Sequence, residues 1–189
     1  MSTGRPAIFL DRDGVINDCI DRGENFYVDG KKVRWTAPWT YDEFRLKEGV
    51  MEALESMRDL GLLRILVTNQ PDVSYGTMSV DDFDRIMSYV RTLAFDGIYL
   101  CSHRRDDACA CKKPKTGMFV QAAREHKLDF RRSFVIGDSD ADVIPARELG
   151  CVSILVDGPN AHGVFADWHV QSLSEAVNII KKKYENIRR

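Results

Sequence analysis

Short apolar runs alternate along the chain with longer segments in which apolar residues recur every three or four positions. The short runs contain mostly Ile, Val, Leu and Phe and cover residues 7–10, 63–67, 97–100, 133–136 and 152–156. Runs with little polar alternation are typical of strands that are covered on both faces. The periodic segments predict helices over residues 49–60, 80–93, 118–126, 141–149 and 174–184. This order predicts an α/β fold, a Rossmann-like parallel sheet with helices on both faces and no large cap domain.

Residues 20–45 break this alternation because they show no sustained period. A structureless segment of this length inside a compact domain is uncommon. Disorder is also disfavoured, since disordered segments are poor in aromatic residues. We therefore predict a folded flap insertion over residues 20–45, with a small hairpin that turns at Asp29-Gly30. Its aromatic residues are Phe26, Tyr27, Trp35, Trp39, Tyr41 and Phe44.

Length and charge limit the classes of function. The chain has 189 residues and a formal net charge of −2, which fits a single domain over residues 1–189 that folds without disulfides. A nucleic-acid or anionic-membrane surface needs a basic excess that is missing here. No apolar run approaches the roughly 20 residues of a membrane span, and no long apolar signal core follows Met1. We expect a cytoplasmic monomer or weak homo-oligomer with reduced thiols and without a nucleic-acid or membrane partner.

Two aspartates, Asp11 and Asp13, follow the first apolar run in the sequence Asp11-Arg12-Asp13-Gly14. Ligands of parallel α/β sheets bind outside the carboxyl ends of the strands, so both carboxylates are expected to face one cleft. One carboxylate can attack phosphorus while the other protonates the leaving oxygen. Because a phosphate ester is also anionic, this chemistry requires a hard divalent cation among the carboxylates. Taken alone, the motif also fits a turn rich in aspartate.

Further polar motifs follow the later apolar runs. Thr68-Asn69-Gln70 offers a hydroxyl and two amides that can bind phosphate, and Lys112-Lys113 supplies cations for a transferring group. Asp138 can ligate the same cation. Asp142 lies one turn into the next helix and can support the ligating residues without binding the cation itself. Each motif also has a purely structural interpretation: a turn, a solvated basic face, or acidic residues at a helix N-terminus. Their joint occurrence in this order favours the active-site interpretation.

Together these residues resemble the four sequence motifs of the haloacid dehalogenase (HAD) superfamily, most of whose members are phosphatases. The matching motifs are Asp11-x-Asp13-Gly14, Thr68, Lys113 and Gly137-Asp138-x-x-x-Asp142. The resemblance implies that Asp11 is the nucleophile that forms an aspartyl phosphate and that Asp13 is the general acid and base. It also implies that Thr68 binds the phosphoryl group and Lys113 stabilises it. Asp11, the backbone carbonyl of Asp13 and Asp138 would hold Mg²⁺.

A second constellation stands directly before the two lysines. It has the spacing C-x-H-x5-C-x-C and consists of Cys101, His103, Cys109 and Cys111. Three sulfurs and one nitrogen make a complete tetrahedral set for zinc, without an open position for water. We therefore predict a structural Zn²⁺-binding loop over residues 101–111, which would fix where the lysines point. The alternative is a chance cluster of partly buried thiols.

Within the superfamily this cluster resembles the zinc-containing branch of D-glycero-D-manno-heptose-1,7-bisphosphate 7-phosphatase and the histidinol-phosphate phosphatase domain. The residues around Asp11 and the sequence Thr68-Asn69-Gln70 are more similar to the heptose enzyme. The resemblance implies a Mg²⁺-dependent phosphomonoesterase acting on a small phosphorylated metabolite. A heptose bisphosphate is the first expectation, and histidinol phosphate or another sugar phosphate is the alternative. It also implies that Asn69, Gln70 and Lys112 help to bind this substrate.

The chain departs from the family pattern where substrate identity is decided. Pro71-Asp72-Val73 stands where the family often has Ser-Gly, and Ser139 stands where a basic residue is frequent. The flap is longer than in the typical heptose enzyme. Its aromatic residues could stack on a sugar while its basic residues meet a second phosphate. Alternatively, the aromatic residues form a small satellite core and the charges are solvated. The basic residues in question are Lys31, Lys32 and Arg34.

Two other classes of function fit parts of the sequence. Some superfamily members remove 3′-phosphates from nucleic acids, but the balanced charge and the lack of a basic stripe count against this activity. A non-catalytic zinc-binding module on an inactive phosphatase fold is the second alternative. The complete motif set argues against it, because decay would have removed at least one of Asp11, Asp13, Lys113 and Asp138.

Overall fold

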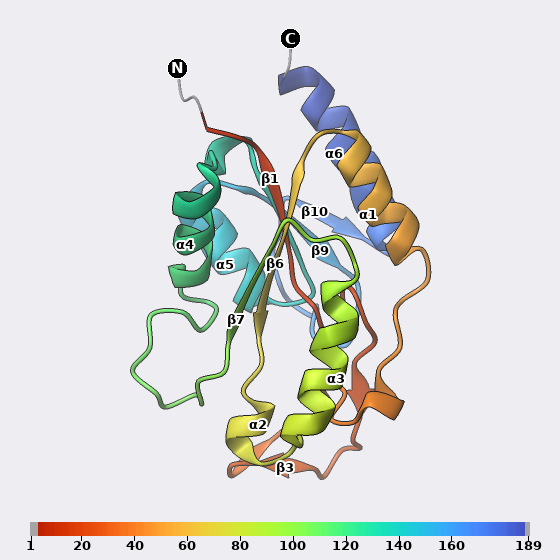
Figure 1. Ribbon diagram of the computed structural model, residues 1–189, viewed down its shortest axis with the longest axis vertical. Coiled ribbons are helices and arrows are strands. Elements are labelled where there is room, and N and C mark those ends of the chain that lie inside the picture. The colour runs from red at the N-terminus through yellow and green to blue at the C-terminus, as the bar shows by residue number, and fades with distance from the viewer. Residues whose placement is uncertain (1–3, 188–189) are drawn as a thin grey trace.

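The computed structural model describes residues 4–187, and its framework is a six-stranded sheet in which all paired strands run parallel. The strand order is β10-β9-β8-β1-β6-β7 (Figure 1). The predicted fold class and the five predicted strands are confirmed. The strands of this sheet are β1 (Ala7–Leu10), β6 (Leu63–Asn69), β7 (Gly97–Cys101), β8 (Phe134–Gly137), β9 (Val152–Val156) and β10 (Trp168–Val170).

Helices cover both faces of the sheet, with α1, α3 and α6 on one face and α4 and α5 on the other (Figure 1). The apolar run of β1 explains this packing. Ile8 and Leu10 enter the core under α1, α3 and α6, whereas Ala7 and Phe9 enter the core under α4 and α5. The helices are α1 (Val50–Asp59), α2 (Asp72–Tyr75), α3 (Val80–Arg91), α4 (Gly117–His126), α5 (Asp140–Leu149) and α6 (Leu173–Ile187), with a 3₁₀ turn η2 (Phe130–Arg132) before β8.

The strand β10 is not predicted by the apolar pattern. It has three residues and lies at the edge of the sheet, where it pairs with β9 alone. Trp168 and His169 are exposed and Val170 is buried. An edge strand has solvent along one flank, so it can form without the continuous apolar run of a central strand.

Residues 20–45 fold into the predicted flap, which contains two small antiparallel ribbons. In the first, β2 (Ile20–Asp21) pairs with β5 (Trp35–Thr36), and in the second, β3 (Tyr27–Val28) pairs with β4 (Lys31–Lys32). The hairpin at Asp29-Gly30 is confirmed, and both residues have positive φ angles, 50° and 71°, as its two-residue turn requires. A 3₁₀ turn, η1 (Tyr41–Glu43), follows. Figure 1 shows the flap, in red and orange, at the end of the molecule near α2.

A satellite core around Trp39 holds the flap together. The guanidinium of Arg22 lies 4.0 Å from the Trp39 ring centroid and donates two hydrogen bonds, of 2.6 and 2.7 Å, to Glu43. The ring of Phe26 also packs on the Trp39 ring, at a centroid distance of 5.5 Å. Two of the flap aromatics therefore pack on each other, as the structural alternative expects. The two lysines of β4 are exposed.

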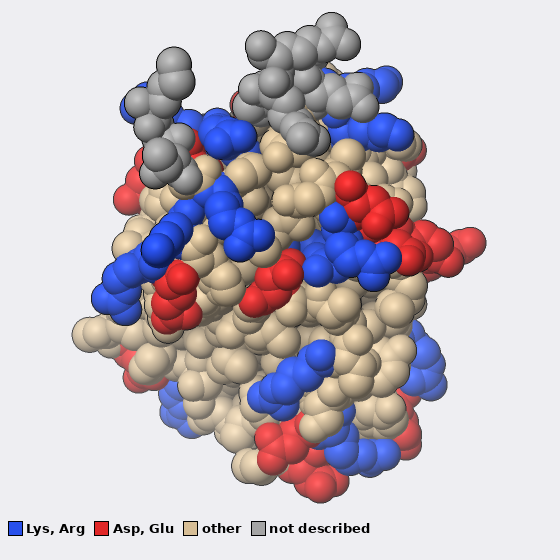
Figure 2. Space-filling model, turned by 45° about the horizontal axis from the view of Figure 1, so that its top comes forward, with Lys and Arg blue, Asp and Glu red and all other residues tan. Residues whose placement is uncertain are grey.

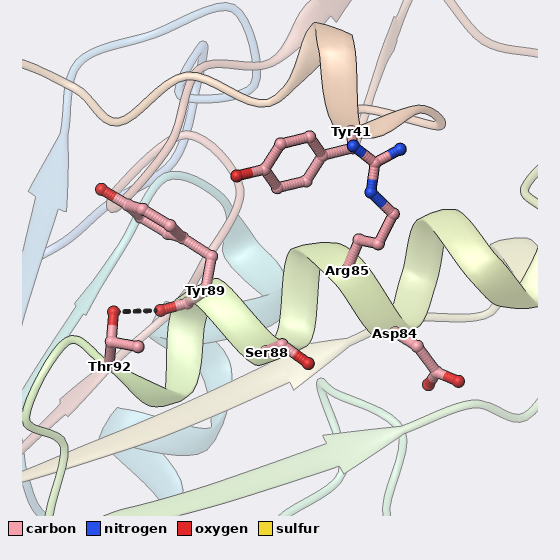
Figure 3. A pocket seen from close by; sticks show the side chains of 6 residues that line it. All are labelled: Tyr41, Asp84, Arg85, Ser88, Tyr89 and Thr92. Atoms are coloured by element: carbon pink, nitrogen blue, oxygen red, sulfur yellow. Dashed lines mark hydrogen bonds between the residues drawn. The ribbon is translucent and has the colours of Figure 1, made fainter.

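The outer side of the flap is anchored on α3. The backbone N–H of Tyr41 donates to Asp82 at 2.9 Å, and the guanidinium of Arg85 lies 4.4 Å from the Tyr41 ring centroid. Figure 3 shows Tyr41 and Arg85 together with Tyr89 around a cavity of about 500 Å³. These contacts do not involve Trp39, so they attach the flap to α3 independently of the satellite core.

The surface carries charges of both signs. On the face shown in Figure 2, Lys and Arg side chains lie interspersed with Asp and Glu side chains, in keeping with the near-neutral balance of the sequence. Each helix within residues 4–187 is too short or too polar to cross a bilayer. The cytoplasmic location and the oligomeric state stay predictions.

Candidate active site

The carboxyl ends of β1, β6 and β8 converge on a cavity of about 250 Å³. Asp11 and Asp13 follow β1, Asn69 ends β6, and Asp138 follows β8, and all four line this cavity. Lys113 reaches it from the loop between β7 and α4. Residues that are far apart in the sequence thus meet because parallel strands end at one edge of the sheet.

Lys113 is the central cation of the site. Its Nζ lies 2.9 Å from Oδ1 of Asp11 and 2.6 Å from Oδ1 of Asp142, and it donates to the carbonyl of Val67 at 2.8 Å. The residue is 4% exposed. Burial lowers the pKa of Lys113, but the two carboxylates outweigh burial and hold the pKa above its ordinary value. Lys113 therefore keeps its positive charge beside Asp11.

The carboxylates of the site fit a divalent cation. Asp11, Asp138 and Asp142 each offer an oxygen, and these oxygens lie within 4.8 Å of one another. Burial raises the pKa of Asp11 to about 7 against the opposing effect of Lys113. Burial, with repulsion from Asp142, also raises the pKa of Asp138 to about 6. A cation between these oxygens would offset both the burial and the repulsion that raise the two pKa values, and an all-oxygen donor set suits Mg²⁺.

Asp138 is held from two sides. Gly14 has a φ of +83°, and a Cβ at this position would collide with Oδ2 of Asp138, so glycine is required for the close approach of the β1 loop. The side-chain amide of Asn160 donates to the same Oδ2 at 2.8 Å. Asn160 lies in the connection between β9 and β10 and was not singled out by any sequence motif.

Asp13 is surrounded by hydrogen-bond donors. Its Oδ1 accepts from Nε and Nη2 of Arg12, at 3.1 and 2.8 Å, and from Nδ2 of Asn17 at 3.0 Å. Its Oδ2 accepts from Nε2 of Gln70 at 2.7 Å. Arg12 and Asn17 are fully buried and Gln70 is 1% exposed, so these donors fix the direction in which the Asp13 carboxylate points.

Not every predicted site residue reaches the cavity wall. Thr68 and Gln70 are buried, and the Gln70 amide donates to the Thr68 hydroxyl at 2.9 Å. Lys112 donates through Nζ to the carbonyl of His103 at 3.0 Å and does not line the cavity. Asn69 does line it, and its side-chain amide also forms two hydrogen bonds, of 3.0 and 3.1 Å, with the backbone of Lys113.

The flap and α2 close the remaining sides of the cavity. Trp35, Thr36 and Ala37 line it from the flap, and Asp72 lines it from the start of α2. Trp35 can therefore contact a ligand in the cavity, whereas Trp39 does not line it. The guanidinium of Arg34, a candidate for binding a second phosphate, pairs instead with Asp21 at 2.9 Å.

The Cys/His cluster comes together in the loop after β7. Each of the four residues offers a ligand atom, and these atoms lie within 4.8 Å of one another. The Sγ atoms of Cys101 and Cys111 are 3.1 Å apart, and Nδ1 of His103 lies 3.4 Å from the first and 3.2 Å from the second. In a tetrahedral zinc site with metal–ligand bonds of about 2.0–2.3 Å, the ligand atoms are separated from one another by distances similar to those in this cluster. The cluster is therefore compatible with zinc.

The parallel α/β sheet and the carboxylate–lysine site at its strand ends define a HAD-like phosphatase. A HAD-hydrolase-like family model matches residues 110–173. The D-glycero-β-D-manno-heptose-1,7-bisphosphate 7-phosphatase of Helicobacter pylori is 38% identical over 76% of this chain and 78% of its own length. The enzyme of the same name from Haemophilus influenzae is 35% identical over 93% of this chain and 97% of its own. The chain belongs to this family of phosphatases.

A solved structure agrees with this assignment. It is described as the D,D-heptose 1,7-bisphosphate phosphatase from B. bronchiseptica complexed with magnesium and phosphate. It superposes with a TM-score of 0.76 at 26% sequence identity, over 94% of this chain and 99% of that chain. The likeness therefore extends over nearly the whole chain.

Proposed function

We propose that this phosphatase removes the 7-phosphate of D-glycero-D-manno-heptose 1,7-bisphosphate through an aspartyl phosphate on Asp11. The observation that carries the chemistry is the contact of Lys113 with Asp11, next to Asp138, in one cavity. The names of the relatives support the sugar substrate. The cavity volume of about 250 Å³ suits the reacting end of such a molecule, with its far end outside.

The carboxylate of Asp11 attacks phosphorus in line with the leaving oxygen, so that an oxygen–phosphorus bond forms as the ester bond breaks. Asp13 donates its proton to the departing alkoxide and then takes a proton from the water that cleaves the aspartyl phosphate. Lys113 stabilises the negative charge on the equatorial oxygens. Asp11, the backbone carbonyl of Asp13 and Asp138 would hold Mg²⁺, which supplies further charge neutralisation for the phosphoryl oxygens when bound.

Hydrogen-bond partners of the reacting groups hold them in position. Arg12, Asn17 and Gln70 orient the carboxylate of Asp13 through the hydrogen bonds described above. Asn69 fixes the backbone of Lys113, and Asp142 holds its ammonium group. In this proposal Gln70 and Lys112 act through their protein neighbours, whereas the resemblance implied direct contact with substrate.

A substrate panel tests the proposed function. Purified protein with Mg²⁺ is expected to hydrolyse heptose 1,7-bisphosphate with a kcat/KM about a hundredfold above that for histidinol phosphate, since the two leaving groups differ in hydroxyl pattern and charge. A 3′-phosphorylated oligonucleotide serves as the nucleic-acid control. EDTA is expected to stop phosphate release and added Mg²⁺ to restore it. A preference for histidinol phosphate would contradict the substrate, and activity that survives EDTA would contradict the metal.

We propose further that Cys101, His103, Cys109 and Cys111 hold a structural Zn²⁺. Elemental analysis of protein purified without chelators is expected to give about one zinc per chain. Cys109→Ser is expected to lose most of this zinc and to lower Tm by about 5–10 °C, since metal-binding energy is folding energy. Cys19→Ser, which alters a thiol outside the cluster, is the control and is expected to keep its zinc. Equal zinc content in Cys109→Ser and Cys19→Ser would contradict this site.

A further inference from the structure

Asp72 is a carboxylate of the cavity wall that the proposed reaction does not use. It is the first residue of α2 and lines the cavity together with Asp13 and Trp35. It is half-buried, and it is separated in sequence from every motif that carries the phosphoryl chemistry except Thr68-Asn69-Gln70. In the proposed reaction Lys113 and Asp138 hold the phosphoryl group, so we assign Asp72, which lines the same cavity from α2, to the leaving group.

One oxygen of Asp72 is fixed and the other is free. Oδ1 accepts a 2.8 Å hydrogen bond from the indole N–H of Trp39 and a 3.4 Å hydrogen bond from the hydroxyl of Thr77. Oδ2 has no donor within residues 4–187, and it is not among the buried atoms that lack a partner. The free oxygen is therefore accessible on a carboxylate whose orientation is already set.

The elements on either side of Asp72 are held in place. The carbonyl of Asp72 accepts from the backbone N–H groups of Thr77 and Met78, at 3.0 and 3.3 Å. Further along α2, the hydroxyl of Ser74 donates to the carbonyl of Ser102 at 2.7 Å, in the loop that carries the Cys/His cluster. On the flap side, Trp39 belongs to the satellite core. A group fixed from both sides can bind a ligand without a large entropic cost.

The charge of Asp72 is not compensated by an ion pair. Arg12 pairs with Asp13, and Lys113 pairs with Asp11 and Asp142. Within the described residues, no cationic nitrogen lies within 4.0 Å of the Asp72 carboxylate. A free carboxylate oxygen accepts hydrogen bonds from hydroxyl groups and repels a second anion brought to the same wall.

We propose that Asp72 determines specificity for the leaving group: it accepts a hydrogen bond from a hydroxyl near the scissile ester and rejects leaving groups that carry an anion there. This inference rests on the proposed phosphatase reaction and narrows its substrates to phosphomonoesters of polyols. A second phosphate is compatible with the site at the far end of the polyol, where it lies away from this wall.

Three small esters separate these effects. Glycerol 1-phosphate has a hydroxyl next to the ester carbon, propyl phosphate has none, and phosphoglycolate has a carboxylate. At about pH 8, where a carboxyl group is ionised, the wild type is expected to prefer them in that order by kcat/KM. In Asp72→Asn the preference for glycerol 1-phosphate over propyl phosphate is expected to fall about tenfold, and phosphoglycolate is expected to gain about tenfold relative to propyl phosphate.

Two further variants separate charge from position. Trp39→Phe keeps the carboxylate but removes its indole donor, so it is expected to raise KM for glycerol 1-phosphate while phosphoglycolate stays rejected. Asp84→Asn changes an exposed carboxylate on α3 that does not line this cavity and is expected to match the wild type. The proposal is overturned if Asp72→Asn changes kcat/KM for all three esters by one common factor.

Failure of the proposed function gives a different result. If the phosphatase reaction itself is wrong, the wild type hydrolyses none of the three esters, whereas a different natural substrate leaves the comparison of the three esters valid. Calorimetric titration with glycerol 1-phosphate and propyl phosphate then decides the role of Asp72 by itself. A binding preference for the glycerol ester that Asp72→Asn removes would support the inference, and equal binding of both esters to wild type and variant would contradict it.

Discussion

Asp11→Asn is expected to abolish phosphate release, with a loss in kcat of at least about ten-thousandfold, as is found when a covalent nucleophile is removed. The amide that replaces the carboxylate has nearly the same shape but lacks the negative oxygen that attacks phosphorus. The buried charge next to Lys113 is halved, yet Asp142 still pairs with the ammonium group at 2.6 Å, so the variant is expected to fold. The measurement is release of inorganic phosphate from an aryl phosphate with Mg²⁺.

The control for this variant is Asp84→Asn, the same chemical change on the exposed surface of α3. It is expected to keep the activity of the wild type, and Tm and circular dichroism check that both proteins are folded. Rapid acid quenching provides a second readout, because the wild type is expected to retain phosphate covalently and Asp11→Asn is not. Equal turnover by Asp11→Asn and the wild type would contradict the assignment of the nucleophile.

The arrangement of the sheet could be predicted because it depends on burial of continuous apolar runs. Ile8 and Leu10 face one layer of helices and Phe9 faces the other. Because both faces of β1 are buried, the strand is apolar throughout, and this apolar run is visible in the sequence. The edge strand β10 has no such requirement, since one of its flanks is open. The strand β10 forms because it pairs with β9, and a contact between two separate segments cannot be predicted from the local sequence pattern.

The core of the candidate site could also be predicted from a positional rule. Asp11, Asp13 and Asp138 were expected together because each follows a strand, and the structure brings all three to one cavity. The same rule could not separate Asn69 from Gln70. Both are amides at the end of β6, and only tertiary packing turns the first toward the cavity and buries the second against Asp13.

Other residues of the cavity could not be found from the sequence. Asn160 and Asp72 come from loop or short-helix positions without periodicity, and their contacts join residues 22 and 33 positions apart. The two aromatic residues Trp35 and Trp39 are chemically equivalent in the sequence. The fold separates them, since Trp35 lines the cavity and Trp39 packs in the satellite core. Which aromatic can meet a ligand is therefore a tertiary property.

Lys113→Met is expected to affect both stability and catalysis. Removing the ammonium group leaves the buried carboxylates of Asp11 and Asp142 without their partner at 2.9 and 2.6 Å. Loss of one partner of a buried ion pair costs about 3–5 kcal/mol, which corresponds to a fall in Tm of about 10 °C for a chain of this size. Loss of the charge next to the transferring group is expected to lower kcat by about a hundred- to a thousandfold. Thermal unfolding and phosphate release measure the two effects.

The double variant Lys113→Met with Asp142→Asn separates these effects. Asp142 is buried, does not line the cavity and in the proposed reaction holds Lys113 rather than Mg²⁺, so neutralising it removes an unpaired charge without changing the reacting groups. The double variant is therefore expected to regain a large part of the lost Tm while kcat stays low. Recovery of both properties would show that Lys113 acts only on the fold. A double variant no more stable than Lys113→Met would show that Asp142 is not the carboxylate that Lys113 neutralises.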